Sequence, residues 1–129
     1  MTEAKTPKDT QSSSEYVEFL LEMLEPMGAL SSGKMFGGYV IRHAAIPFAL
    51  IFNDEIYFKV DAHNKADYEM TGSEPFRYTK GNKEIEISNW KLPEELLDDP
   101  ETLIEWAFKS YEAGLRAKAA KRPTAKKRG

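Results

Sequence analysis

The sequence contains no cysteine and only two histidines, His43 and His63. The missing thiols exclude disulfides, thiolate nucleophiles and cysteine-ligated zinc or iron–sulfur sites. No H-x-x-H or H-E-x-x-H spacing joins the two histidines. We therefore expect neither a metal centre nor a bound cofactor.

Long apolar runs are missing as well. No stretch reaches the roughly 18 apolar residues of a membrane-spanning helix, and the N-terminus lacks the charged and then apolar segments of a signal peptide. We therefore expect a cytoplasmic protein without membrane contact. A chain of 129 residues is long enough for one domain with a substantial core and too short for two.

Acidic residues are missing from the end of the chain. Seven of the 18 Lys and Arg residues lie from Arg116 onward, whereas all 21 Asp and Glu residues lie before it. The first 115 residues therefore hold 11 basic and 21 acidic groups, although the formal net charge of the whole chain is only -3. This distribution indicates an acidic body with a basic tail.

The N-terminal part of the chain is expected to form a leader and a helix. Residues 1–11 lack large apolar side chains after Met1 and are expected to be disordered. Ser12 and Glu15 fit a capping box, which marks a helix start. The apolar residues that follow recur at intervals of three and four, as on one helix face: Tyr16, Leu20, Met23, Leu24 and Met27. The helix is expected to end near Pro26–Gly28.

From Lys34 onward the apolar period changes to two, which indicates strands. Three strands are expected: residues 39–43, residues 46–52 with Ile46, Phe48, Leu50 and Phe52 on one face, and residues 56–60 with Ile56, Phe58 and Val60 on one face. Asn53 and Asp54 tolerate the left-handed backbone of a two-residue hairpin turn. The sequence therefore predicts an antiparallel meander.

A short helix and a second hairpin are expected next. The helix covers residues 61–70, with Asp61 as its N-cap and with Ala62, Ala66, Tyr68 or Met70 facing inward. The hairpin has strands over residues 76–79 and 84–88, and Trp90 leads the chain out of the sheet.

The last helix is expected to begin at Asp99 and Pro100, because a capping Asp before a Pro in the first helical position is a strong start signal. The order of elements predicts a two-layer α+β fold, with an antiparallel five-stranded sheet and helices on one of its faces. The domain is expected to cover residues 12–117. A basic helix end and a disordered tail follow over residues 118–129.

Several short motifs resemble those of a known family. In order along the chain, they are Met35, Phe36, Gly37, Gly38 and Tyr39, then Phe48-Ala49-Leu50-Ile51, Pro75, Phe76 and Tyr78, Trp90 and Pro93, and Leu97 and Asp99 with Leu103 and Trp106. The ordered set resembles the N-terminal domain of the TfoX (Sxy) regulators of DNA uptake competence over roughly residues 15–117.

The resemblance implies a two-layer fold similar to the secretion chaperones, with the same order of elements. Full-length competence regulators add a C-terminal helical domain similar to helix-hairpin-helix modules, and this chain is expected to be a form without it. The usual glycine after the MFGGY segment is replaced by Val40, so the strand that starts there is expected to run straighter.

Catalytic residues are not predicted. Acidic pairs such as Glu84 with Glu86 lie on the polar face of a strand, and the pairs Glu94/Glu95 and Asp98/Asp99 lie at a helix start, where acids are expected on structural grounds. Gly37 and Gly38 are interpreted as a bend in the chain, because no helix N-terminus follows them to complete an anion site. We therefore expect a non-enzymatic binding or regulatory module that contacts an unidentified protein partner.

Two surfaces are candidates for contacts. The apolar arc of the last helix is wider than one sheet face requires, which predicts a homodimer unless the first helix covers the surplus. Its interface is expected to be part of the surface of Trp106, Phe108 and Tyr111, or an exposed edge of the sheet. The alternative function is weak, sequence-independent nucleic-acid binding by the basic tail. The candidate phosphate contacts are Arg116, Lys118, Lys121, Arg122, Lys126, Lys127 and Arg128.

Overall fold

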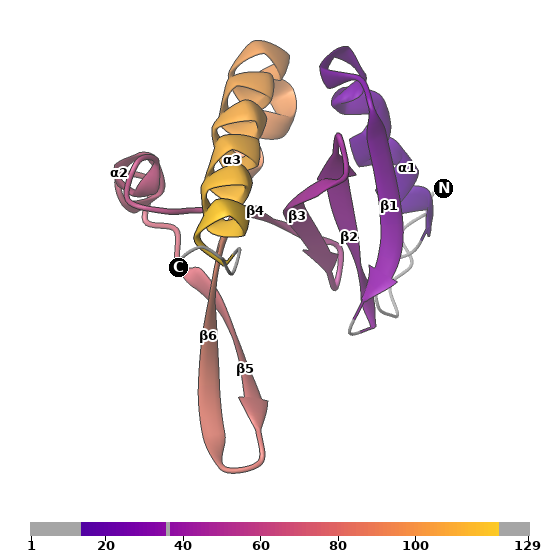
Figure 1. Cartoon of the computed structure of the whole chain (residues 1–129). Coiled ribbons are helices and arrows are strands. Elements are labelled where there is room, and N and C mark those ends of the chain that lie inside the picture. The colour runs from indigo at the N-terminus through magenta and orange to yellow at the C-terminus, as the bar shows by residue number, and fades with distance from the viewer. Residues whose placement is uncertain (1–13, 36, 122–129) are drawn as a thin grey trace, which may run out of the picture.

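The computed structural model describes residues 14–35 and 37–121 (Figure 1). The expected leader (residues 1–11), the capping residue Ser12 and residues 122–129 lie outside this range. The elements are α1 (Ser14–Met23), the 3-10 turn η2 (Glu25–Met27), β1 (Leu30–Met35), β2 (Gly38–His43), β3 (Ile46–Phe52), β4 (Glu55–Lys59), α2 (Lys65–Glu69), β5 (Pro75–Lys80), β6 (Lys83–Lys91), the 3-10 turn η3 (Glu94–Asp98) and α3 (Pro100–Lys121). The predicted α+β class is confirmed.

Within the described residues the sheet has six antiparallel strands in the order β1-β2-β3-β4-β6-β5, so the expected number of five is wrong. The missed strand is β1, whose sequence Leu-Ser-Ser-Gly-Lys-Met has no apolar alternation. Among the described residues it is an edge strand that pairs with β2 alone, and all six of its residues are exposed or half-buried. An edge strand needs little apolar surface, so periodicity could not reveal it.

A β-bulge at Phe48 changes the face that β3 presents to the core. Ile41 pairs with Ala49, and the next residue, Arg42, pairs with Pro47, which leaves Phe48 as the extra residue. The expectation that Ile46, Phe48, Leu50 and Phe52 share a face is therefore wrong beyond the bulge. The core side chains there are Ala49 and Ile51, at 1% and 0% exposure, while Leu50 and Phe52 lie on the opposite face and are half-buried.

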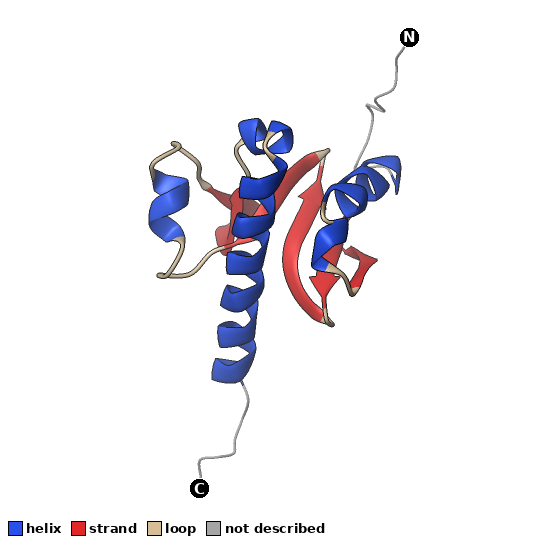
Figure 2. Cartoon of the chain, turned by 90° about the horizontal axis from the view of Figure 1, so that it is seen from above, coloured by secondary structure: helices blue, strands red, loops and turns tan. Residues whose placement is uncertain are grey.

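The helices and turns cover one face of the sheet. Figures 1 and 2 show α3 between α2 on one side and α1 on the other. The core cluster combines side chains from the helices, such as Leu20 of α1 and Leu103 of α3, with those of one sheet face, such as Ile41, Ile51 and Phe58. The predicted alignment of Ile56, Phe58 and Val60 on one face is confirmed, because all three are buried in this cluster. This burial is the main stabilising contribution to the fold.

The segment before α2 differs from its prediction. The helix covers only Lys65–Glu69, and its N-cap is Asn64 rather than Asp61. The Asp61 carboxylate accepts hydrogen bonds from Arg116 and from the backbone N–H of His63, so it does not cap the helix. Of the four residues that were candidates to face the core, only Tyr68 is buried, and Ala62, Ala66 and Met70 are exposed.

The hairpin and the last helix agree better with the sequence. The β5–β6 hairpin is confirmed and projects beyond the other strands in Figure 1. Trp90 does not leave the sheet, however, because it belongs to β6 and pairs with Phe58 and Pro75. The start of α3 is confirmed, since the Asp99 carboxylate accepts a hydrogen bond from the N–H of Thr102 at 3.4 Å.

Two tight turns have left-handed backbones. The predicted Asn53-Asp54 turn is confirmed, with φ of 54° and 59°. The β2–β3 turn consists of Ala44 and Ala45, with φ of 50° and 70°, which alanine adopts at a cost of about 1–2 kcal/mol per residue. The sequence gives no sign of this turn, because alanine is not a usual turn residue.

The double substitution Ala44→Asn/Ala45→Gly is expected to raise the free energy of unfolding by about 1–2 kcal/mol, because Asn-Gly suits this turn. Urea unfolding followed by circular dichroism measures the change. As a control, Ala119→Gly on the exposed face of α3 should lower stability by about 1 kcal/mol. A double variant less stable than the natural protein would contradict the strain assigned to the turn.

Candidate binding groove

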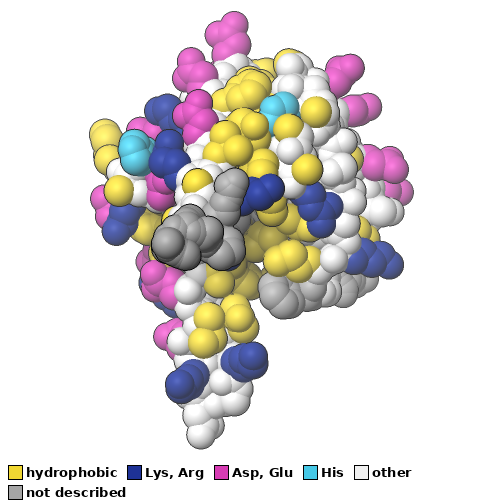
Figure 3. Space-filling model, viewed as in Figure 1, with side chains coloured by type: hydrophobic (Ala, Val, Ile, Leu, Met, Phe, Trp, Pro, Cys, Tyr) yellow, Lys and Arg dark blue, Asp and Glu magenta, His cyan; other side chains and the backbone are white. Residues whose placement is uncertain are grey.

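A groove of about 940 Å³ lies where the last turns of α3 meet the start of β3 and the stem of the β5–β6 hairpin. In Figure 3, hydrophobic side chains gather in this hollow, and Lys and Arg side chains lie around it. Its volume is at the upper end of the range of ligand-binding pockets. The groove is therefore the first candidate for a functional site.

The floor of the groove is largely aliphatic. Val40 of β2 and Leu50 of β3 are cross-strand partners on the face that the helices leave uncovered. Ile87 of β6 and Ala117 of α3 extend the apolar lining on the other sides. The bulge at Phe48 creates this floor, since it turns Leu50 away from the core.

Gly114 fixes the position of α3 along the groove. A Cβ atom at this position would lie 2.8 Å from the carbonyl oxygen of Pro47 and 2.9 Å from Cγ2 of Ile46. These distances are too short for any side chain, so glycine allows the helix to approach β3 closely. The two turns that follow, with Ala117, Lys118 and Lys121, are thereby brought to the edge of the groove.

The rim of the groove is cationic. Arg42, Lys59, Lys118 and Lys121 line it, against the single acid Glu86. The Arg42 guanidinium lies over Gly33, where a side chain would crowd it. The Lys59 ammonium donates a hydrogen bond to Ser88 Oγ at 2.8 Å. Burial lowers the pKa of Lys59, and the nearby charge of Lys121 lowers it further against the opposing effect of Asp61.

An aromatic cluster continues the uncovered face of the sheet next to the groove. The Phe76 ring lies 5.4 Å from that of Phe52, 4.9 Å from that of Tyr57 and 6.2 Å from that of Tyr78. Burial, together with a hydrogen bond to Glu55, raises the pKa of Tyr57 to about 12, so its hydroxyl stays protonated. Tyr78 is 36% exposed and also lines the groove.

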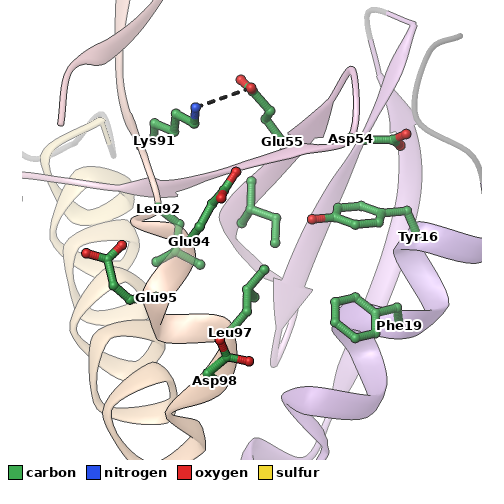
Figure 4. Close-up of a pocket in the computed structure, with 11 residues that line it drawn as sticks. Tyr16, Phe19, Asp54, Glu55, Lys91, Leu92, Glu94, Glu95, Leu97 and Asp98 are labelled. Carbon is green, nitrogen blue, oxygen red and sulfur yellow. Dashed lines mark ion pairs between the residues drawn. The ribbon is translucent and has the colours of Figure 1, made fainter. Parts of the chain in front are cut away.

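A second, acidic cleft of about 680 Å³ lies near the other end of α3 (Figure 4). In Figure 4, Tyr16 and Phe19 of α1 lie across the opening from Leu97 of η3. The acids in its lining are Asp54, Glu55, Glu94, Glu95 and Asp98. Burial raises the pKa of Tyr16, and the charges of Asp54, Glu94 and Glu55 reinforce the shift.

One acid of this cleft, Glu55, contacts two neighbouring side chains. It forms an ion pair with Lys91 at 3.2 Å and accepts a hydrogen bond from the Tyr57 hydroxyl at 3.0 Å. Within residues 14–35 and 37–121, no three Asp, Glu or His side chains are grouped so that they could hold a metal ion. In the same residues, no helix is both long and apolar enough to cross a membrane.

Comparison with protein families identifies the fold. The family model described as the TfoX N-terminal domain matches residues 22–114, most of the chain. This chain belongs to the TfoX N-terminal domain family. The resemblance predicted from the motifs is therefore confirmed, and the chain is a competence-regulator-like module. No curated protein matches it.

The motif residues of the TfoX N-terminal domain serve several structural roles. Met35 and Tyr78 line the groove, and Phe76 belongs to the aromatic cluster. A side chain at Gly38 would run into the carbonyl oxygen of Ile51, so this glycine permits close pairing of β2 with β3. The other described members are Gly37 in the β1–β2 turn, Tyr39 and Trp90 against the core, Pro75 at the start of β5, and Pro93 before η3. Phe36 lies outside the described residues.

The aromatic residues of α3 contact other elements of the same chain. The Trp106 ring lies 4.6 Å from that of Tyr68 in α2, and the rings of Phe108 and Tyr111 lie 5.6 Å and 4.5 Å from that of His43. The His43 ring in turn is held by the carbonyl oxygen of Gly28, 2.7 Å from Nδ1. Part of the wide apolar arc is therefore covered by α2 and β2. Phe108 remains 36% exposed, and the homodimer stays a prediction.

The basic residues predicted to contact nucleic acid separate into three groups. Arg116 forms an ion pair with Asp61, with Nε 2.7 Å from Oδ2 and Nη2 3.1 Å from Oδ1. Lys118 and Lys121 lie at the rim of the groove. The remaining four, Arg122, Lys126, Lys127 and Arg128, lie outside the described residues.

Sequence reasoning missed the groove residues Arg42 and Lys59. Each alternates with core residues along its strand, and no motif of the sequence sets either of them apart. Their shared site depends on the pairing of β2, β3, β4 and β6, which no local pattern contains. The only signal in the sequence was the presence of positive charges on three separate elements, β2, β4 and α3. Such a signal is weak.

The Asp61–Arg116 ion pair is expected to make stability depend on pH. The hydrogen bond from Arg116 lowers the pKa of the Asp61 carboxyl, so its contribution is present above the ordinary Asp pKa of about 3.9 and is lost as the pH falls through the lower folded-state value. Asp61→Asn should lower the free energy of unfolding by about 0.5–1 kcal/mol near neutral pH, because the pair is partly exposed.

Urea unfolding at about pH 7 and about pH 3 measures this difference, which should shrink at the lower pH. Arg116→Lys removes the two-point contact while keeping the charge, and should show a smaller version of the same loss. An equal destabilisation by Asp61→Asn at both pH values would contradict the assignment.

Proposed function

We propose that this TfoX N-terminal domain is a non-enzymatic regulatory module that acts by binding another protein, in a role linked to competence or transcription. The observation that carries the proposal is the apolar surface on the uncovered face of the sheet. Leu50 is the accessible part of the groove floor, since its partner Val40 is 4% exposed, and Phe76 and Tyr78 continue the floor as an aromatic surface. An apolar centre with a polar rim is the arrangement found in protein contact sites.

Photo-crosslinking in cells tests the proposal. A p-benzoylphenylalanine residue in place of Tyr78, which is 36% exposed beside the groove, should give a discrete crosslinked protein. The matched control places the same residue at Phe19, which is 42% exposed on α1 near the acidic cleft. Equal crosslinking at the two positions, or none at Tyr78, would contradict the proposal. So would a catalytic turnover that a single polar substitution abolishes.

Nucleic-acid binding is the second candidate, favoured by Lys118 and Lys121 at the rim and by the basic residues after them. A gel-shift titration at low and moderate salt should then show binding that weakens with salt, since each phosphate contact releases counterions. The full chain should be compared with a chain that ends at Lys121. A chain that ends at Leu115 is not suitable, because it would lose Arg116 and its ion pair with Asp61. Equal nucleic-acid binding by the full and the shortened chain would show that the residues after Lys121 do not contribute to binding.

We also propose that the module forms a homodimer through the exposed part of α3, where Phe108 and Leu115 are 36% and 40% exposed. Light scattering over a dilution series should give a mass near twice the 14.7 kDa of one chain. Phe108→Glu should shift that mass toward one chain, because it places a charge in the contact. The mass of a single chain at every concentration of the natural protein would exclude the dimer.

A further inference from the structure

The chemistry of the groove indicates which segment of a partner it accepts. We propose that the groove binds an acidic peptide segment that also carries aliphatic side chains such as leucine. The aliphatic side chains contact the floor of the groove, and the carboxylates form ion pairs with the cations of its rim. This inference rests on the proposed function, since it names the chemical class of the protein partner. Three features of the groove carry it.

The first feature is the shape of the apolar lining. Leu50, Ile87 and Ala117 are half-buried and offer aliphatic contacts at which branched side chains fit. Single-stranded nucleic acids need successive aromatic platforms for their bases. Among the described residues, the lining holds two aromatic side chains, Phe48 at 1% exposure and Tyr78 at 36%, and the Phe76 cluster lies beside the groove and not in its lining. The floor therefore favours a peptide over a nucleic acid.

The second feature is the charge of the rim. The single acid of the lining, Glu86, is itself paired with Arg77, whose Nε lies 3.3 Å from the carboxylate. The four cations Arg42, Lys59, Lys118 and Lys121 thus face the groove without a compensating acid in its lining. Two of these cations, Arg42 and Lys59, belong to the first 115 residues, which carry 21 acids and 11 bases, and the other two lie just after them. Such a contrast favours an acidic segment and directs it to this site.

The third feature is the state of the rim lysines. Lys59 is partly desolvated and held in place by Ser88 Oγ, with Lys121 nearby. A carboxylate beside these two ammonium groups would relieve their repulsion. Among the described residues, neither Lys118 nor Lys121 forms an ion pair, so both ammonium groups are available to a ligand.

Fluorescence anisotropy with the purified full chain tests the proposal. The probe is a labelled short peptide of alternating Leu and Glu. Three matched probes are a peptide with Lys in place of Glu, a peptide with Ser in place of Leu, and an oligothymidylate of the same length. We expect the Leu–Glu peptide to bind at least about tenfold more tightly than each of the other three.

Two pairs of variants locate the binding. Ala117→Glu places an acid in the groove and should weaken binding about tenfold or more, whereas Ala119→Glu makes the same charge change on the exposed side of the same helix and should have little effect. Lys118→Gln/Lys121→Gln should also weaken binding, while Lys80→Gln/Lys83→Gln at the hairpin tip should not. Circular dichroism confirms that each variant is folded.

Several outcomes would overturn the proposal. They are no binding of the Leu–Glu peptide, equal binding of the Leu–Lys peptide, equal binding of the Leu-free peptide, tighter binding of the oligothymidylate, and equal loss in the Ala117 and Ala119 variants. If the peptide fails while crosslinking at Tyr78 persists, the partner is a protein of another chemistry and the proposed function stands. If both fail, the proposed function fails with it.

Discussion

The single extra residue at Phe48 is the constraint on which the arrangement of this domain depends. Side chains alternate along a strand, so an inserted residue moves every later side chain to the opposite face. Before the bulge, Ile46 faces α3, and after it Ala49 and Ile51 take over the core positions. Leu50 is thereby released to the second face, where it becomes groove floor. The core and the groove are consequences of the same irregularity.

The position of α3 then decides how the groove is bounded. Gly114 brings the helix against β3, while contacts of Tyr68 with Trp106, of Asp67 with Lys109 and of Asp61 with Arg116 tie the α2 region to the other side of the helix. Because these contacts are distributed along the helix, they limit both its rotation and its sliding. The last turn is therefore held at the rim, and the direction of its lysines is set by contacts that lie elsewhere on the helix.

Local chemistry explains which parts of the fold were predictable. The Asn53-Asp54 turn, the capping of α3 by Asp99 and the alternation in β4 and β6 each have a cause within a few residues. The edge strand β1, the bulge and the Ala44-Ala45 turn have no such local signal, since they depend on the register in which β1, β2 and β3 pair and not on their residue types. The same reason applies to the groove, whose residues come from separate elements. The motifs predicted the family but not the site, because motif residues such as Gly38 and Tyr39 pack within the fold and only Met35 and Tyr78 line the groove.

The formal net charge of -3 is a poor guide to what this domain attracts, because its charges are separated in space. The acidic cleft lies near the start of α3 and the basic groove at its end, and a helix of 22 residues is about 33 Å long. The Debye length at physiological ionic strength is about 8 Å, so each field acts on an approaching ligand almost independently. An anionic segment is therefore drawn to one end of α3 and repelled from the other. For the acidic peptide proposed above, this charge separation is what would orient the peptide before any apolar contact forms.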